Sequence, residues 1–395
     1  MNGWRILQII NTLSATHKCE PLMTTISRNV SKRSFTFGGP ILKRFFPGRK
    51  EEVDMKRKKK KFSRGVPTHI YQKGFDGRVL FFCAKDRLVY LSIFFGEAKS
   101  RGIQVLSIVL MFNHVHATII CQSERQMIAF NQEVERRYAS AFNRASGKTG
   151  PVFMNAFGWA QKRSDADVQS NLCYLANNPV KKKLCRRGID NQWTLLAYGK
   201  ERYPFSDPLA LRKASRKMRR AVALAKDSMK RGQVLSYPLL DRIFADLDQR
   251  ESRQMVDYLI QNLSNVDYEA AARYFGDYDK MIAAFDVTTG AEYDISEEFV
   301  PESDRPYEEM IKVVEQEGYD LVKKAFLSAE GEEKMRLIKL FRRRTSASER
   351  QIRRFLHLPF NPASKKLGYE DYSGARYSDF PGPDIPDYVY SDFPG

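Results

Sequence analysis

Cysteine and histidine are scarce in this chain of 395 residues, which contains five of each. The cysteines are widely separated and none forms a CxxC pair, so the sequence indicates neither a zinc ribbon nor a disulfide framework. Long apolar runs are also missing, since none approaches the roughly eighteen residues of a membrane-spanning helix. The apolar patch at 4–10 is short and interrupted by polar residues, unlike a signal peptide. We therefore expect a cytoplasmic protein with reduced thiols and no membrane partner.

Acidic residues are the minority charge, because 47 Asp and Glu stand against 66 Lys and Arg, a formal net charge of +19. Such an excess favours a polyanionic partner, and we prefer nucleic acid to a membrane surface, which predicts association with the nucleoid. Hydrophobic residues make up 43% of the chain and aromatic residues 12%, so most of it is expected to fold.

Composition divides the chain into four segments. Residues 1–66 form a basic extension, with a Lys/Arg run at 56–61, and are expected to be poorly ordered. Residues 67–200 mix strand and helix signals, whereas 207–360 are rich in Leu, Ala, Lys and Arg and are expected to be all-α. Residues 361–395 are acidic, repeat Tyr-Ser-Asp-Phe-Pro-Gly at 377–382 and 390–395, and are predicted to be disordered.

The segment 67–200 predicts an α+β domain. The expected elements are strands at 68–73, 103–112 and 116–121, helices at 84–101, 124–145 and 165–178, a turn at 74–77, and an edge strand or loop at 153–161. The apolar run 103–112 is typical of a central strand buried on both faces. Pro179 should end the last helix, because proline disfavours helix in the residue before it. This β-α-β-β-α-β order with an added helix is the ferredoxin-like arrangement, an antiparallel sheet with helices on one face.

The segment 207–360 predicts a series of helices. They are expected at 209–231, 237–246, 250–263, 267–274, 307–327 and 331–344. Near the end, Ser346 to Glu349 has capping-box spacing and opens a further basic helix. Residues 334–357 therefore suggest a helix-turn-helix, with a plain bundle helix as the alternative.

Two of the five histidines, His114 and His116, flank Val115 directly after the most apolar strand. Alternate residues of a strand point to the same side, so both imidazoles would project from one face. Two imidazoles there make half of a divalent-metal site, although closely spaced histidines are also common on surfaces and in cores.

Tyr174 and Asn178 are four residues apart on the predicted helix 165–178, and so share one face. A phenol, with a pKa of about 10, is a poor nucleophile at neutral pH unless a metal offsets the charge of the transition state. An amide oxygen one turn away could complete the shell of such a metal. The same residues would also suit an ordinary helix end.

Together these motifs resemble the single-tyrosine HUH transposases, particularly the REP-associated tyrosine transposases, and also insertion-sequence transposases. The resemblance covers about residues 67–185. Its matching strings are Thr68-His69-Ile70, Leu110-Met111-Phe112-Asn113-His114-Val115-His116, Gly150-Pro151-Val152-Phe153 and Tyr174-Leu175-Ala176-Asn177-Asn178-Pro179-Val180. Phe112 departs from the proline common in that family, and Ala176-Asn177 replaces bulkier residues, but neither change removes a reactive group.

The resemblance implies an HUH nuclease fold and a metal-dependent enzyme. His114, His116 and Asn178 would bind Mg²⁺ or Mn²⁺, and Tyr174 would form a 5′-phosphotyrosine while freeing a 3′-hydroxyl. The activity implied is the nicking and rejoining of single-stranded DNA, with hairpin DNA as partner, by a monomer or homodimer. His69 is expected to be structural or a hydrogen-bonding residue at the edge of the site.

Two other interpretations use the same residues. A non-catalytic DNA-binding regulator could retain the fold, although the intact tyrosine, histidines and asparagine argue against it. The string His116-Ala117-Thr118-Ile119 also fits two-histidine phosphoesterases, but those require a second such motif, which the remaining histidines do not supply.

Basic clusters beside these motifs are candidates for DNA contacts, although solvated helix faces are their default interpretation. On the helix 124–145 and after Tyr174 these are Arg136, Arg137, Lys181 and Lys182. In the suggested helix-turn-helix, Arg350 and Gln351 would face base edges, and Arg353 and Arg354 would face phosphates.

Overall fold

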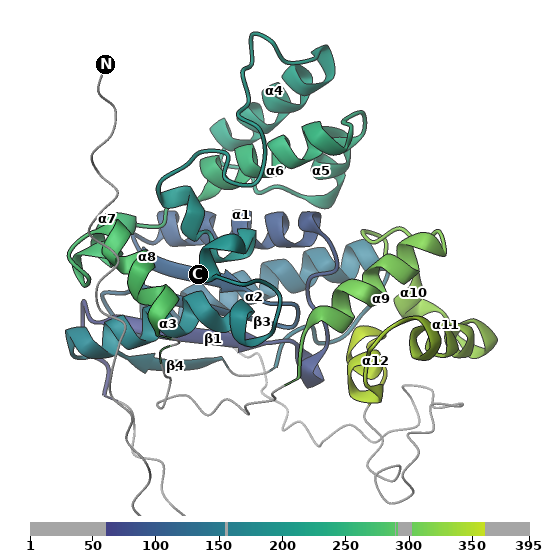
Figure 1. Ribbon diagram of the computed structural model, residues 1–395, viewed down its shortest axis with the longest axis horizontal. Coiled ribbons are helices and arrows are strands. Elements are labelled where there is room, and N and C mark those ends of the chain that lie inside the picture. Colours follow the sequence, from purple (N-terminus) through teal and green to yellow (C-terminus); the bar gives the residue numbers. More distant parts are fainter. Residues whose placement is uncertain (1–60, 155–156, 289, 291–301, 360–395) are drawn as a thin grey trace, which may run out of the picture. The chain divides into compact units, whose positions relative to one another are not determined.

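The structure is a computed structural model that describes residues 61–154, 157–288, 290 and 302–359. The predictions for 1–60 and for the tail 361–395 lie outside these residues. A four-stranded antiparallel sheet in the order β2-β3-β1-β4 organises the first part of the chain (Figure 1). Its elements are β1 (Pro67–Lys73), α1 (Ala84–Ser100), β2 (Gln104–Leu110), β3 (His114–Ile120), α2 (Glu124–Ser146), β4 (Gly158–Gln161) and α3 (Asp165–Lys181). This is an α+β fold with the predicted β-α-β-β-α-β order.

The two faces of the sheet are covered by different helices. On β3, Val115, Ala117 and Ile119 pack in the large core that also contains the apolar side chains of α1 and α2. Side chains alternate along a strand, so His114, His116 and Thr118 lie on the opposite face. That face is covered by α3, whose Leu175 packs with Val109 of β2. The expectation of helices on one face only was therefore wrong, because α3 lies on the other.

The apolar strand β2 lies at an edge of the sheet, not at its centre as predicted. Its outer side is covered by a later segment of the chain: Val105 forms a parallel bridge with Val266, and its carbonyl accepts the Asp267 N–H at 2.8 Å. A covered edge strand is buried on both faces just as a central one is, so an apolar run does not distinguish the two.

Helix α3 continues through Pro179 and ends at Lys181, whereas the sequence predicted its end at Asn178. Its start is fixed by Ser164, which forms a capping box with Asp167. Proline has no backbone N–H, so the helix loses one hydrogen bond at Pro179. The carbonyl of Pro179 still accepts a hydrogen bond, from the Leu184 N–H at 2.9 Å. Pro179 is buried in this last turn, so packing outweighs the lost hydrogen bond.

The remainder of the described chain is helical. It contains the 3₁₀ turns η2 (Gly188–Asp190), η3 (Gln192–Thr194) and η4 (Leu196–Gly199), and the helices α4 (Arg216–Lys230), α5 (Tyr237–Phe244), α6 (Gln249–Leu263), α7 (Tyr268–Arg273), α8 (Tyr278–Val287), α9 (Arg305–Gln316), α10 (Ala325–Ser328), α11 (Gly331–Arg344) and α12 (Glu349–Phe355). Two predictions need correction, and one helix was missed. Helix α4 starts late because Ser215 caps it, the helix predicted at 307–327 ends at Gln316 before Gly318, and α8 was not predicted. None of the described helices is long and apolar enough to cross a membrane.

The late helices share one core with the sheet. Phe82, just before α1, packs edge-to-face on Phe326 of α10 and Phe355 of α12, with ring centroids 5.3 and 5.1 Å apart. Lys324 is fully buried against this core and pairs with Asp86 of α1 at 2.8 Å. The last helices are therefore part of the structure that surrounds the sheet.

Candidate functional site

Three histidines gather on the face of the sheet that α3 covers. His116 on β3 is completely buried, and its Nδ1 lies 2.9 Å from Nε2 of His69 on β1. His114 is also buried, and its Nδ1 lies 2.7 Å from Oδ1 of Asn113. Because the Nδ1 of each predicted ligand is engaged, both rings are oriented by neighbours, as is usual for metal-binding imidazoles. His69 therefore has the hydrogen-bonding role expected from the sequence.

Tyr174 of α3 lies over the same histidines. Its ring is perpendicular to that of His116 at a centroid distance of 5.7 Å, and is 6.1 Å from that of His69. His114 and His116 are themselves 5.0 Å apart between ring centroids. The Nζ atom of Lys181, two turns along α3, lies 4.5 Å from the centre of the Tyr174 ring. The structure thus brings together a phenol, two imidazoles and an ammonium group from segments about sixty residues apart.

Asn178 lies one helical turn after Tyr174 and is buried. Its neighbour Asn177 is structural, because its amide donates to the carbonyls of Phe285 and Thr288 and so joins α3 to α8. Within the described residues no group of three or more His, Cys, Asp or Glu side chains could hold a metal ion. A metal here would depend on the two imidazoles together with an amide oxygen. The carbonyl oxygen suits Mg²⁺ and Mn²⁺, while the imidazoles alone would suit a softer divalent ion.

Tyr71 of β1 supports the histidines from the side and was not singled out in the sequence. Its ring stacks on that of His116 at 5.8 Å with an interplanar angle of 22°. Gly158 of β4 is its cross-strand neighbour, and a Cβ at Gly158 would collide with the Tyr71 ring. The glycine therefore leaves the space that the stacked tyrosine needs. Alternation along β1 places Tyr71 and His69 on the face of the site, a signal that the sequence did contain.

The predicted DNA contacts on α2 are remote from this site. Arg136 pairs with Glu133 of its own helix, and Arg137 pairs with Glu97 of α1. Since α2 packs on the opposite face of the sheet, these arginines do not line the tyrosine site. Their contacts to DNA stay a prediction.

The suggested helix-turn-helix has the expected helices, α11 and α12, but α12 is packed against the first half of the chain. Arg353 is buried and pairs with Asp76, and the buried Gln351 donates to the carbonyl of Ser303 at 2.7 Å. Side chains held in this way cannot enter a DNA groove, so the assignment of both to DNA contacts was wrong. Arg350 is only half-buried, and its predicted base contact stays a prediction.

A cavity of about 70 Å³ lies beside His114. Helices far along the chain form one side of it: Asp304 precedes α9 without a side-chain capping hydrogen bond, and Arg354 projects from α12. Lys182 at the end of α3 and Lys73 of β1 also line it. Asp304 is almost fully buried, and this burial raises the pKa of its carboxyl to about 6, a shift that the charges of Lys182 and Arg354 reduce. Two of the lining residues, Lys182 and Arg354, had been predicted to contact DNA.

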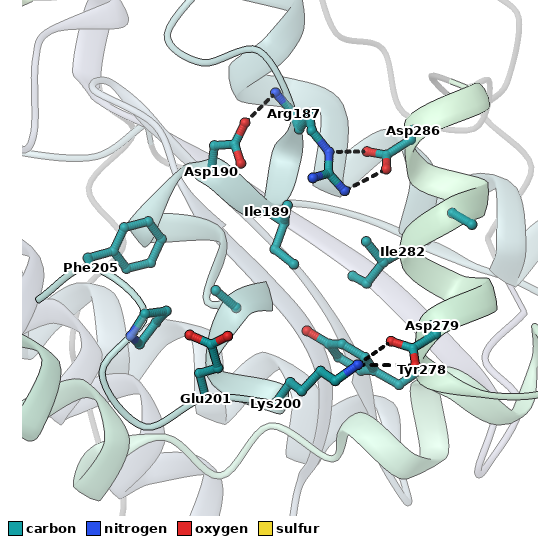
Figure 2. Close-up of a pocket in the computed structure, with 13 residues that line it drawn as sticks. Arg187, Ile189, Asp190, Lys200, Glu201, Phe205, Tyr278, Asp279, Ile282 and Asp286 are labelled. Atoms are coloured by element: carbon teal, nitrogen blue, oxygen red, sulfur yellow. Dashed lines mark hydrogen bonds and ion pairs between the residues drawn. The ribbon is translucent and has the colours of Figure 1, made fainter. Parts of the chain in front are cut away.

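A larger hollow of about 480 Å³ lies between α8 and the 3₁₀ turns η2 to η4 and contains none of the predicted catalytic or metal-binding residues. Figure 2 shows that its charged side chains face one another: Arg187 pairs with Asp286, and Lys200 with Asp279. These pairs join α8 to the segment after α3. The hollow therefore has a structural explanation.

The described residues define an α+β protein with a tyrosine above a buried histidine pair. No family model and no curated protein matches the chain. One solved structure, described as "Structure of the REP associates tyrosine transposase bound to a REP hairpin", is similar at 14% identity over 35% of this chain and 81% of that chain, with a TM-score of 0.31. A likeness of this size carries no argument about fold or function.

Proposed function

We propose that this protein is a transposase-type DNA strand transferase with an HUH nuclease fold, in which Tyr174 nicks and rejoins single-stranded DNA. The observation that supports the proposal is the position of the Tyr174 ring against His116, which has His114 beside it, with Asn178 one turn away on the same helix. The sequence string containing the histidines and that containing the tyrosine lie apart in the chain, yet they meet on one face of the sheet.

The reaction proposed is a transesterification. The Tyr174 oxygen attacks phosphorus, a P–O bond forms, the bond from phosphorus to the 3′ oxygen breaks, and a 5′-phosphotyrosine and a 3′-hydroxyl result. The phenolic proton is lost and the 3′ oxygen gains one, so no oxidant or ATP is needed. Attack of a 3′-hydroxyl on the phosphotyrosine reverses the step and rejoins a strand.

The residues around the tyrosine have defined roles in this step. Lys181 places a positive charge near the ring, where negative charge develops as the phenol loses its proton. His69 and Asn113 orient His116 and His114. Mg²⁺ or Mn²⁺ bound by His114, His116 and Asn178 would supply charge neutralisation at the phosphoryl oxygens.

The test is incubation of the protein with labelled single-stranded hairpin DNA and Mn²⁺, followed by denaturing electrophoresis. We expect a covalent adduct with the wild type and none with Tyr174→Phe, while Tyr203→Phe, outside the histidine cluster, keeps it. Removal of the metal with a chelator should abolish the adduct, and added Mn²⁺ should restore it. DNA binding without any adduct across a broad pool of hairpins would support a non-catalytic regulator instead.

A further inference from the structure

The cavity beside His114 contains an acidic side chain with an unsatisfied hydrogen-bonding atom. Asp304 is 5% exposed, and its Oδ2 is buried with no hydrogen-bond partner among the described residues. Its backbone is fixed, since its N–H donates to the carbonyl of Lys182 at 2.9 Å. A buried acceptor without a donor destabilises the folded state, so a water, an ion or a ligand is expected to supply the missing hydrogen bond. Asp304 is therefore placed to accept a hydrogen bond from a bound molecule.

Positive groups line the same cavity. Arg354, Lys73 and Lys182 come from three different elements, and the Nε atom of Arg354 is also buried without a partner in the described part of the chain. Glu302 also lines the cavity, so three cationic and two acidic side chains face it. The cations would repel a metal ion, while the carboxylates of Asp304 and Glu302 would repel a simple anion such as inorganic phosphate. A ligand that has both N–H donors and a phosphate satisfies the two kinds of group together. A nucleotide is such a ligand.

The dimensions and the position of the cavity agree with one base of a bound strand. Its volume of about 70 Å³ admits roughly five water-sized groups, which is enough for the edge of a base. His114 lines it on one side, so a base held there would belong to a nucleotide next to the attacked phosphate. Enzymes that hold an unpaired base commonly bind its Watson–Crick edge by hydrogen bonds.

We propose that this cavity binds one nucleotide of the DNA strand and that Asp304 selects guanine there. Guanine presents an imino and an amino N–H side by side on its Watson–Crick edge, which suits a carboxylate acceptor. Adenine and cytosine offer an amino group only, and thymine has a carbonyl on each side of its single N–H, where it opposes the charge of Asp304. This specificity rests on the proposed function, and the late helices α9 and α12 supply the residues that determine it.

The experiment uses fluorescence anisotropy with the full chain in chelator, so that binding is measured without chemistry. The probes are labelled twelve-residue oligothymidylates that contain one central guanine, one inosine, which lacks the amino group, or neither. We expect the guanine probe to bind the wild type about tenfold more tightly than the all-thymine probe, with inosine between them. Asp304→Asn should bind all three alike, whereas Asp279→Asn, the same charge change in the hollow of Figure 2, should keep the preference.

Each outcome decides one proposal. Equal affinity of the wild type for the three probes, or an undiminished guanine preference in a folded Asp304→Asn protein, overturns the assignment of the cavity. The comparison of guanine with inosine on the wild type decides the matter even if the variant does not fold. Failure to bind any of the oligonucleotides contradicts the proposed DNA substrate itself, so the two proposals fail in distinguishable ways.

Discussion

Lys324 supports a prediction about stability, because its ammonium group is fully buried and paired with a single carboxylate. Its Nζ donates to Oδ1 of Asp86 and to the Val322 carbonyl, at 2.8 and 2.9 Å. Asp86 also accepts hydrogen bonds from the Phe82 and Cys83 N–H groups and from the Tyr237 hydroxyl. The perturbation is Lys324→Met, which keeps most of the aliphatic chain in place and removes the charge.

The expected loss can be worked out from these contacts. The carboxylate of Asp86 keeps three donors in the variant, so the loss comes mainly from an uncompensated buried charge, a change that typically costs about 3–5 kcal/mol. The ammonium also lies 4.9 Å from the centre of the Phe142 ring and 5.0 Å from that of Tyr237, contacts worth up to about 2 kcal/mol when desolvated. The introduced methionine side chain retains the apolar part of this packing, so we expect a total loss of about 4 kcal/mol.

The measurement is equilibrium unfolding in urea, followed by tryptophan fluorescence and by circular dichroism. Asp86→Leu alone should lose more, because it strands the ammonium and also removes the acceptor of three further donors. The double variant should lose much less than the sum of the two, since replacing a buried pair by apolar side chains is often close to neutral. A loss below about 1 kcal/mol for Lys324→Met, or additive losses in the double variant, would refute the argument.

Three further predictions concern the described residues. Burial keeps the pKa of His357 well below its ordinary value of 6.5, so on acidification this residue is protonated in the unfolded chain before it is protonated in the folded protein. Between pH 7.5 and pH 5.5 the free energy of unfolding of the wild type should therefore fall by about 1.4 kcal/mol more than that of His357→Gln in urea titrations. Parallel pH profiles of the two proteins would contradict this. Gly158→Ala should displace Tyr71, lowering adduct yield about tenfold and stability by about 1–3 kcal/mol, and unchanged yield and melting would count against the stacking role. Arg353→Met breaks the ion pair with Asp76, which is partly exposed, so we expect the free energy of unfolding to fall by about 1–2 kcal/mol. The affinity for oligonucleotides should stay within twofold of wild type. A large loss of affinity in a folded variant would restore the DNA-contact assignment.

The local elements were predictable because their signals are local. Periodicity placed the helices now seen as α1 and α2 within one residue at each end, and alternation placed both imidazoles on one face of β3. The spacing of Tyr174 and Asn178 placed both on one helix face, while the role of the tyrosine came from the resemblance of the combined motifs to a transposase family. These inferences use only the neighbours of a residue in the chain.

The errors came from contacts between distant segments. Nothing near β2 reveals that Val266 covers its edge, and nothing near α12 reveals that Arg353 pairs with Asp76, 277 residues earlier. Basic residues on a short capped helix therefore looked like a DNA-reading surface. Asp304 was missed for the same reason, because an acidic residue before a helix is an ordinary N-cap in the sequence and becomes unusual only when the cavity is known.

The packing of Phe82 on Phe326 and Phe355 also has a consequence for the order of events during synthesis. A core that joins residues more than 240 positions apart has a high loop-closure entropy and forms late. On the ribosome, the aromatic core beside the sheet could pack only after most of the chain had emerged. We therefore expect nascent chains stalled before Phe326 to be sensitive to protease, and chains that expose residues through Phe355 to become resistant. The sheet that carries the histidines beside Tyr174 would then become stable only near the end of translation.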